Sequence, residues 1–460
     1  MTRSIEDLLG PEPADDASDS YDVEERAEIV ERLNRSHAYV AGKGVIRETE
    51  HGDFQIESVH QFHDWYSNDG VWSKSKSGAD IFTSAAKIWM QSPDRRQYQR
   101  IVLDPRGKAR GAYNLWKGFS FEPSAKGDCG LFLDHLRDNV CDGDKAHYRW
   151  LVGWMAHLVQ RPWEKPGTAV VLKGKPGVGK TTVGEHLGAL IARHYVTVST
   201  PRGLMGQFNA HLGAALLVQP EEGFWAGDKA AESDLRHKIT GATFNLERKG
   251  QDVIELPSFH RYLITSNERW TVPAQHDERR YAIFNVGAAR IKDGAYFAAI
   301  AAEMKAGGYG ALMRHLLDFD LSRVDVRAIP HTEALAAEKI TGLRNVRAWW
   351  HETLAAGEIP AGLQRTRFNN EPQSWRDDDV SVLTDDLRAA YEHWVKARRH
   401  HGDICTADMF GRELRDMCPS AKRVQRRAGN GERSRYYDIP SLGRCREEFA
   451  RWLNSEVNWS

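Results

Sequence analysis

Long hydrophobic runs are missing from this sequence, and so are the cysteine patterns that stabilise small secreted domains. No apolar run approaches the length needed to cross a bilayer, so the sequence predicts no membrane span. The opening MTRSIEDLLG lacks the basic-then-apolar layout of a signal peptide, and we therefore expect a cytoplasmic protein. No C-x-x-C pair or metal-ligand spacing occurs, which indicates reduced thiols for the scattered cysteines Cys129, Cys141, Cys405, Cys418 and Cys445.

The overall charge is also small, which says little about partners because the charged residues are unevenly placed. The formal net charge is -1, yet acids crowd the first twenty residues and the stretch Arg412 to Arg435 is basic. A hydrophobic share of 41% and a charged share of 28% are typical of a globular protein. A length of 460 residues predicts two or three domains.

The order of composition and periodicity along the chain predicts several segments. The first is acidic, rich in serine and proline and poor in large apolar residues, which is typical of disorder. We expect a disordered tail over 1–20, a small α+β module over 21–105, a helical segment over 106–165, an α/β core over 166–325, a helical segment and linker over 326–380, and a separate domain over 381–460.

Five short apolar runs between Thr168 and Val286 alternate with helical or loop patterns. They are TAVVLKG, HYVTVST, GAALLV, RYLITSN and RYAIFNV. Continuous apolar runs suit strands buried on both faces, and alternation with helices favours a mostly parallel sheet. A long helical stretch from about Asp293 to Asp320 closes this α/β domain.

A glycine-rich loop follows the first of these strands and precedes a helix. The segment GKPGVGKTT matches G-x-x-x-x-G-K-[ST], a pattern whose backbone N–H groups face phosphate oxygens. Lys180 is placed to reach the β- and γ-phosphates, and the Thr181 hydroxyl to bind Mg²⁺. The predicted nucleotide-binding residues are Gly174, Lys175, Pro176, Gly177, Val178, Gly179, Lys180, Thr181 and Thr182.

Polar residues follow two further strands, and an arginine pair precedes a third. Glu221 and Glu222 come after GAALLVQP, where one carboxylate can hold Mg²⁺ and its neighbour can polarise the attacking water. Asn267 ends RYLITSN and could position that water, because strand carboxyl ends line the ligand crevice of such sheets. Arg279 and Arg280 precede RYAIFNV; an arginine supplied across a subunit boundary neutralises transition-state charge.

This succession of motifs resembles superfamily 3 helicases. More narrowly, LNRSHAYVAGKGVIRE, YNLWKGFSFEP, GDKAAESDLRHKITG, TSN and ERRYAIFNV look like phage- and plasmid-borne primase-helicase proteins, over roughly residues 30–320. The resemblance implies an AAA+ P-loop ATPase fold, a homohexameric ring with ATP and Mg²⁺ between subunits, and 3′-to-5′ translocation on single-stranded or forked DNA. It also implies replication of a phage or mobile element in a bacterial host cytoplasm.

The resemblance assigns roles to individual residues. Lys180 and Thr181 become the Walker A pair, Glu221 and Glu222 the Walker B pair, with Thr181 and Glu221 at the metal. Asn267 becomes the sensor 1 residue and Arg279 or Arg280 the arginine finger. A hairpin that grips DNA in the ring channel fits FNLERKGQDVIEL, with Arg248, Lys249 and Gly250 at its turn and Lys249 as the phosphate contact.

Two departures qualify this resemblance. Gln219 and Pro220 precede the glutamates where the family more often has apolar residues and an Asp-Glu pair, so the two glutamates' roles stay open. Many relatives carry a primase-polymerase domain before the helicase, whereas the first hundred-odd residues here lack the room for one and contain no D-x-D cluster. We therefore expect any priming to come from a separate primase or polymerase.

The last eighty residues read as two helices followed by a basic hairpin, AKRVQRRAGNGERSRYYDIP. This order resembles a winged-helix DNA-binding domain, which relatives often carry here. The wing's arginines and lysine would contact phosphates. The predicted DNA-binding residues of this hairpin are Lys422, Arg423, Arg426, Arg427, Arg433 and Arg435.

Other functions use the same nucleotide residues. A non-unwinding AAA+ loader or origin-binding ATPase is the main alternative, and a ring in which ATP serves only assembly is another. A P-loop GTPase is disfavoured because the chain contains no N-K-x-D motif. A small-molecule kinase is disfavoured by the arginine pair and the basic hairpin.

Overall fold

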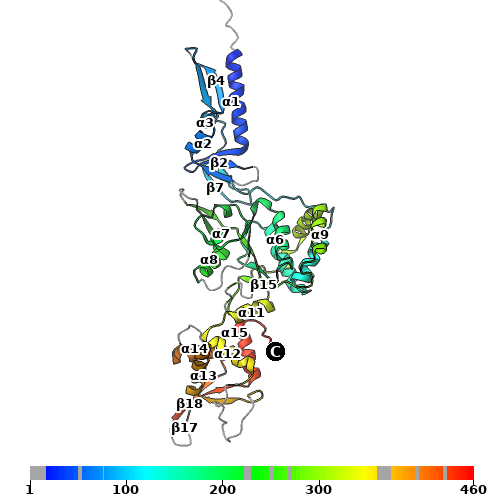
Figure 1. Ribbon diagram of the computed structural model, residues 1–460, viewed down its shortest axis with the longest axis vertical. Helices are drawn as coiled ribbons and strands as arrows, with labels where there is room; N and C mark the ends of the chain where they lie inside the picture. The colour runs from blue at the N-terminus through cyan, green and yellow to red at the C-terminus, as the bar shows by residue number, and fades with distance from the viewer. Residues whose placement is uncertain are drawn as a thin grey trace, which may run out of the picture. The chain divides into compact units, whose positions relative to one another are not determined.

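A computed structural model describes the protein at residues 17–49, 54–75, 77–221, 229–247, 253–267, 272, 274, 276–359, 375–398, 404–427 and 433–459. The chain forms two units, Met1–Gly118 and Phe119–Ser460. No helix within the described ranges is long and apolar enough to span a membrane. Figure 1 labels the helices and strands used below.

The N-terminal unit is an α+β module built on a small sheet. Helix α1 (Ala17–Ser36) precedes the sheet and includes the last four residues of the predicted acidic tail. The sheet order is β3-β2-β1-β6, with β1 (His37–Val40), β2 (Gly44–Glu48), β3 (Phe54–Glu57) and β6 (Gln97–Tyr98). Phe62 and Trp89, both fully buried, lie in its core with Val45 and Leu33.

Two short helices and two strand pairs complete this unit. Helix α2 (Val59–Trp65) begins with a capping box between Ser58 and Gln61, which satisfies backbone donors at the helix start. Helix α3 spans Ala85–Gln91. Strands β4 (Gly70–Lys74) and β5 (Asp80–Ser84) pair antiparallel, and β7 (Arg100–Val102) and β8 (Ala112–Asn114) pair parallel.

The second unit contains a five-stranded parallel sheet, as the five apolar runs predict. Its order is β10-β11-β14-β9-β15. The central strands β9 (Ala169–Lys173) and β14 (Arg261–Ser266) are buried along their whole length. The other strands are β10 (Tyr195–Val198), β11 (Leu217–Pro220) and β15 (Tyr281–Asn285). Because β14 lies between β9 and β11, the ends of these three strands meet at one edge of the sheet.

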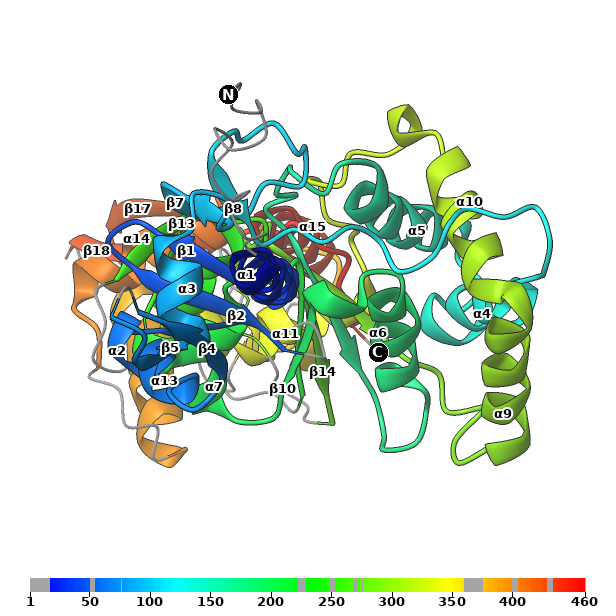
Figure 2. The same cartoon turned by 90° about the horizontal axis from the view of Figure 1, so that it is seen from above.

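Helices cover this sheet on both faces. Figure 1 shows α6 (Lys180–Ala189) and α9 (Gly294–Glu303) on one side, and α7 (Pro201–Met205) and α8 (Lys229–Thr240) on the other. Figure 2 shows α6 beside β14, with which it is in contact. The remaining helical elements before the C-terminal module are α4 (Gly130–Asp134), a π-helical turn (His135–Val140), α5 (Lys145–Gln160), a second π-helical turn (Met304–Gly308), α10 (Tyr309–Asp318), α11 (Glu333–Thr341), and short 3₁₀ turns at Ala192–His194, Ala210–Leu212 and Leu321–Arg323.

A β-hairpin separates β11 and β14 in sequence, in the place predicted for the DNA-gripping hairpin. Strands β12 (Thr243–Leu246) and β13 (Ile254–Pro257) pair antiparallel, with Leu246 opposite Ile254. The predicted contacts at the turn, Arg248 and Lys249, lie outside the described residues.

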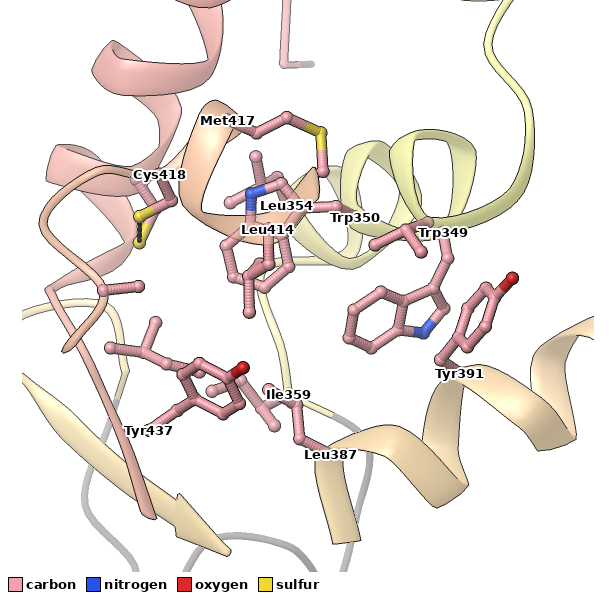
Figure 3. Close-up of a cluster of buried hydrophobic side chains, with 14 of the residues drawn as sticks. Trp349, Trp350, Leu354, Ile359, Leu387, Tyr391, Leu414, Met417, Cys418 and Tyr437 are labelled. Atoms are coloured by element: carbon pink, nitrogen blue, oxygen red, sulfur yellow. Dashed lines mark hydrogen bonds between the residues drawn. The ribbon is translucent and has the colours of Figure 1, made fainter. Parts of the chain in front are cut away.

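The C-terminal part is a helical module with a three-stranded antiparallel sheet of order β16-β18-β17. Its elements are α12 (Asn345–Ala356), β16 (Val380–Leu383), α13 (Thr384–Ala397), α14 (Ala407–Met417), β17 (Lys422–Arg427), β18 (Arg433–Ile439) and α15 (Leu442–Leu453). Figure 3 shows Trp349 beside Tyr391 in its core, and the thiol of Cys418 donates to that of Cys445 at 3.6 Å.

The core of this module extends farther back along the chain than the predicted boundary at 381. Val346, Trp349, Trp350 and Leu354 of α12 are buried against residues of α13, α14 and α15. The sequence prediction placed α12 in the helical segment before residue 381. The pattern of a tryptophan-rich amphipathic helix shows that one face is buried, but it does not show which core that face joins. All five cysteines are free and buried, as predicted for reduced thiols.

Candidate functional site

The glycine-rich loop connects the end of β9 to the start of α6. Gly177 and Gly179 have φ angles of 81° and 95°, in the left-handed region that favours glycine. A Cβ on Gly179 would lie 2.6 Å from atoms of His135 and of Phe297, so a larger residue would displace the loop. Backbone conformation and packing therefore both require glycine at position 179.

Two buried side chains from the first π-helical turn support this loop from behind. Asn139 donates from Nδ2 to the carbonyl oxygen of Val178 at 2.9 Å. The His135 ring lies 3.3 Å from the carbonyl oxygen of Gly179 through Nε2 and 3.3 Å from the Tyr296 hydroxyl through Nδ1. Burial lowers the pKa of His135 against the opposing hydrogen bond to Gly179, so the ring is neutral near pH 7. A neutral imidazole fixes the loop without changing its charge.

A cavity of about 680 Å³ opens in front of the loop. The Lys180 ammonium donates to the carbonyl oxygens of Gly174 at 2.7 Å and Lys175 at 3.0 Å, and to Oδ1 of Asn267 at 2.8 Å. Residues from five segments line the cavity: Pro176, Gly177, Gly179, Lys180, Thr181, Thr182, Ser199, Glu221, Thr265, Ser266, Asn267, Lys292, Gly294 and Phe297. Two residues predicted to act together, Lys180 and Asn267, are therefore in direct contact although 87 positions separate them.

The carboxylate predicted for the metal also faces this cavity. Pro220 is the last residue of β11, as expected for a residue without a backbone donor. Glu221 continues the pairing for one position, because its N–H donates to Val198 and it bridges Thr265. This places Glu221 in the same cavity as Thr181, so carboxylate and hydroxyl oxygens suited to Mg²⁺ share one space. Glu222 lies outside the described residues.

Lys292 and Ser199 line the cavity but carry no motif that the sequence could reveal. Lys292 has a φ of 55° and donates its backbone N–H to the carbonyl oxygen of Gly177 at 2.9 Å. Its side chain is thereby held beside the loop and adds a second cation to the cavity. The one sequence signal for Lys292 was its position after β15, because the segment from β15 to α9 begins at the carboxyl edge of the sheet.

The arginine pair lies at the opposite edge of the sheet. The carbonyl oxygen of Arg280 accepts from Ala169, the first residue of β9, while the glycine-rich loop follows the last. A strand rises about 3.3 Å per residue, so roughly 15 Å of sheet separates the pair from the loop. Neither arginine lines the cavity described above. They are therefore not placed to act on the cavity of their own chain.

The two arginines differ in their surroundings. Buried Glu278 accepts from the backbone N–H of Arg279 at 2.9 Å and of Arg280 at 2.7 Å, and forms an ion pair with the Arg280 guanidinium at 3.3 Å. The Arg279 side chain is exposed. Glu278 thus fixes the backbone of both residues and the side chain of Arg280, which leaves Arg279 directed to solvent.

A buried ion pair anchors the strand that leads into the glycine-rich loop. Lys173, the last residue of β9, donates to Oε2 of Glu338 in α11, and Oε1 of Glu338 accepts from the backbone of Val272 at 2.9 Å. The neighbouring Lys339 donates to the carbonyl oxygen of Leu453 at 2.8 Å at the end of α15. Helix α11 is therefore held by one charged side chain to the sheet and by the next to the C-terminal module.

Replacing Glu338 by glutamine should destabilise the second unit strongly. The amide leaves the buried Lys173 charge without its counter-ion, and removing one partner of a buried pair costs about 3–5 kcal/mol. We expect a matching loss in the free energy of unfolding, measured by chemical denaturation. Glu333→Gln, an exposed site on the same helix, is the control and should change little. Equal unfolding midpoints for the two variants would show that the pair does not anchor β9.

The predicted DNA contacts of the C-terminal hairpin lie on two different faces of its strands. Antiparallel register pairs Arg427 with Arg433 and Gln425 with Arg435, and alternation adds Arg423 to this face. All four of these arginines are exposed. On the other face Arg426 forms an ion pair with Asp438 and donates to the Ser381 hydroxyl at 2.9 Å, while Lys422 lies opposite Asp438. Four arginines thus share one open face, whereas Arg426 is engaged within the sheet.

Fold and site together define a mixed α/β protein whose parallel sheet carries a glycine-rich loop and a polar cavity at the carboxyl ends of its strands. A model for a family of unknown function (DUF5906) matches residues 172–280, which include the loop, Glu221, Asn267 and both arginines.

A curated relative of this chain comes from a phage. The chain is 28% identical over 154 residues to the DNA primase-polymerase of Nitratiruptor phage NrS-1, a match that covers 33% of this chain. The matched segment spans about a fifth of that relative, or 21% of its length.

Solved structures of the NrS-1 C-terminal region share the fold of this chain. One apo structure superposes with a TM-score of 0.63 at 15% identity, covering 90% of this chain and 99% of that one. A second apo structure, the A form, gives a TM-score of 0.62 at 16% identity over 89% and 99% of the two chains. The likeness extends over both units and shows a common architecture.

Proposed function

We propose that this protein is an ATP-dependent DNA helicase of the superfamily 3 type, acting as a hexameric ring in the replication of a phage or mobile element. The observation that carries the proposal is the cavity in which Lys180, Thr181, Glu221 and Asn267 meet around the glycine-rich loop. The strand order, with β14 inserted between β9 and β11, is the arrangement expected of an AAA+ core. Similarity to a phage DNA primase-polymerase supports a place in DNA replication.

The cavity residues suit each part of ATP hydrolysis. The loop N–H groups and the start of α6 bind phosphate oxygens, and Lys180 neutralises the β- and γ-phosphates. Thr181 and Glu221 supply the oxygen ligands of Mg²⁺, and Asn267 orients the attacking water. Glu222 is the proposed general base in this scheme. Substituting each glutamate by glutamine in turn would show whether Glu221 and Glu222 have these roles or the reverse. Lys292 adds positive charge on the loop's outer side.

The arginine pair supports a ring rather than an isolated ATPase. Arg279 is exposed at the edge of the sheet opposite its own cavity, so a useful target for it lies on a neighbouring subunit. Arg280 is engaged by Glu278, which favours Arg279 as the arginine finger. Supplying the finger in trans makes hydrolysis depend on assembly.

Two hairpins are the proposed DNA contacts. The β12–β13 strand pair is the proposed channel element, with Arg248 and Lys249, which lie between the two strands in the sequence, as its proposed DNA contacts. The C-terminal module has the order α12-β16-α13-α14-β17-β18, the succession of a winged-helix domain with β17 and β18 as the wing. Its arginine face suits sequence-blind phosphate contacts.

Strand displacement tests the proposal against its main alternative. A non-unwinding AAA+ loader or origin-binding ATPase would use the same cavity, so ATP turnover alone does not separate the two functions. We expect DNA-stimulated ATP hydrolysis together with ATP-dependent release of a labelled strand from a forked duplex. Stimulated hydrolysis without any strand release, on forks with either tail polarity, would favour the loader.

Removing arginines from the open face of the C-terminal hairpin should weaken DNA binding in a salt-dependent way. The variant Arg427→Ala with Arg435→Ala removes up to two phosphate contacts. The slope of log K against log salt should then fall by about 0.9 per lost contact on duplex, or about 0.7 on single strands. Arg426→Ala is the control, because Asp438 and Ser381 already engage this side chain. Equal slopes for the double variant, the control and the unsubstituted protein would exclude this face as the DNA contact.

A further inference from the structure

The N-terminal unit carries a cluster of positive charge that the ATPase does not use. The connection from β7 to β8 runs from Leu103 to Gly111 and is called here the basic connection. It presents three exposed cations, Arg106, Lys108 and Arg110, and Arg100 at the start of β7 is exposed as well. Strands β7 and β8 are parallel with Arg100 opposite Ala112, so Arg100 lies at the end where the connection returns.

A single carboxylate organises the backbone of this connection. Oδ1 of Asp104 accepts from the N–H of Arg106 at 3.0 Å, and Oδ2 accepts from Lys108 and Ala109, both at 2.8 Å. Asn114 of β8 closes the base by exchanging two hydrogen bonds with the backbone of Asp104, at 2.9 and 2.8 Å. The one acidic group in the segment is therefore occupied by backbone donors, and the cations sit on an ordered scaffold.

The connection also projects into open space. Gly107 and Gly111 both have a φ of 65°, and a Cβ at either position would meet nothing within 4 Å. The arginines and the lysine alternate with small or apolar residues in the order R-G-K-A-R. Uncrowded cations on an ordered turn can contact the spaced charges of a phosphate backbone.

Several other cations of this unit form ion pairs with carboxylates. Ion pairs join Arg32 to Asp69, Arg35 to Glu31, Arg47 to Glu57 and Lys74 to Asp80, and both Arg96 and Lys117 to Glu48. Over the described part of the unit, no ion pair involves Arg100, Lys108 or Arg110. Arg100, Lys108 and Arg110 thus lie together on and beside one short connection, whereas Lys43 and Lys87, for which the described residues show no ion pair either, lie singly elsewhere in the unit.

We propose that the basic connection is a DNA-binding element that gives the N-terminal unit its own phosphate contacts. The ligand is a DNA backbone because the side chains are long, exposed and cationic, and no aromatic residue or polar pocket between them would read a base. The choice of DNA rests on the proposed function, whereas the cationic surface itself does not depend on ATP hydrolysis. Arg106, Lys108 and Arg110 make the contacts and Arg100 extends them.

A salt titration of DNA binding by the full chain tests this element. The test variant replaces Arg106, Lys108 and Arg110 by glutamine. The control variant replaces Arg32, Arg35 and Lys74 by glutamine, which removes the same formal charge from the same unit at side chains paired with carboxylates. Binding of a fluorescent single strand and of a duplex is measured without nucleotide by anisotropy over a range of salt. Thermal melting and basal ATPase verify that both variants are folded.

The test variant should show a salt slope lower by about 0.7 per lost contact on single strands, or about 0.9 on duplex. The control variant should retain the slope of the unsubstituted chain. An unchanged salt slope for the test variant overturns the proposal, and so does an equal loss of slope in the test and control variants. Neither result contradicts the helicase assignment. An unsubstituted chain that binds neither DNA overturns the proposed function as well.

Discussion

Lys180→Ala should abolish ATP turnover while the protein remains folded. The ammonium lies at the back of the cavity in contact with Asn267 and with two loop carbonyls, so no neighbouring cation occupies the same point. Losing one preorganised charge from such a site lowers turnover on the order of 10²-fold or more. We expect this loss in a Mg²⁺-dependent phosphate-release assay, accompanied by weaker ATP binding in equilibrium titration.

The control for this variant is Lys145→Ala, an exposed lysine at the start of α5 and away from the cavity. It should turn over ATP like the unsubstituted protein. Thermal melting of both variants separates a lost charge from a lost fold, because Lys180 is buried and its removal also changes packing. Turnover by Lys180→Ala at the unsubstituted rate would remove the nucleotide assignment altogether.

Arg279→Ala should also lose hydrolysis, and it should regain part of it when mixed with Lys180→Ala. An arginine finger contributes about 10³-fold or more to turnover, and its loss leaves ATP binding in place. In a mixed ring, some interfaces combine the intact cavity of an Arg279→Ala subunit with the intact finger of a Lys180→Ala subunit. Hydrolysis in the mixture should therefore exceed the sum of the two separate variants and peak at intermediate ratios.

Arg280→Ala is the informative comparison for this experiment. Its guanidinium is paired with the buried Glu278, so its removal should lower stability as well as activity. We expect Arg279→Ala to melt like the unsubstituted protein and Arg280→Ala to melt at a lower temperature. Absence of recovery at every mixing ratio, with mixed rings verified by differently tagged subunits, would indicate a site completed within one chain.

Local patterns in the sequence were sufficient for the sheet and for the glycine-rich loop. The runs TAVVLKG and RYLITSN contain buried strands and GAALLV leads into one, because short continuous apolar runs suit strands of a parallel sheet that is buried on both faces. The loop was predictable because its glycines, its lysine and its threonine are adjacent in sequence. The residues that follow the strands, Glu221 and Asn267, were predictable because parallel strands deliver their carboxyl ends to one edge.

Other predictions depended on which residues meet, and the sequence could not decide them. Arg279 and Arg280 are equivalent in sequence, but only Arg280 lies within reach of the Glu278 carboxylate. Arg426 resembles the other arginines of its hairpin until the register sets it against Asp438. In each case the arginines have the same residue type, and only the carboxylate that folding brings beside one of them makes it an ion-paired side chain.

The sequence by itself thus determined the strands, the glycine-rich loop and the polar residues that end two strands, because these depend on adjacent residues and on periodicity. Tertiary structure alone decided that Lys292 enters the cavity, that His135 and Asn139 support the loop, and that α12 joins the C-terminal core. Each of these contacts joins segments far apart in the chain, such as the 44 positions between His135 and Gly179. Such contacts depend on how the helices pack across the sheet, and local sequence patterns do not determine that packing.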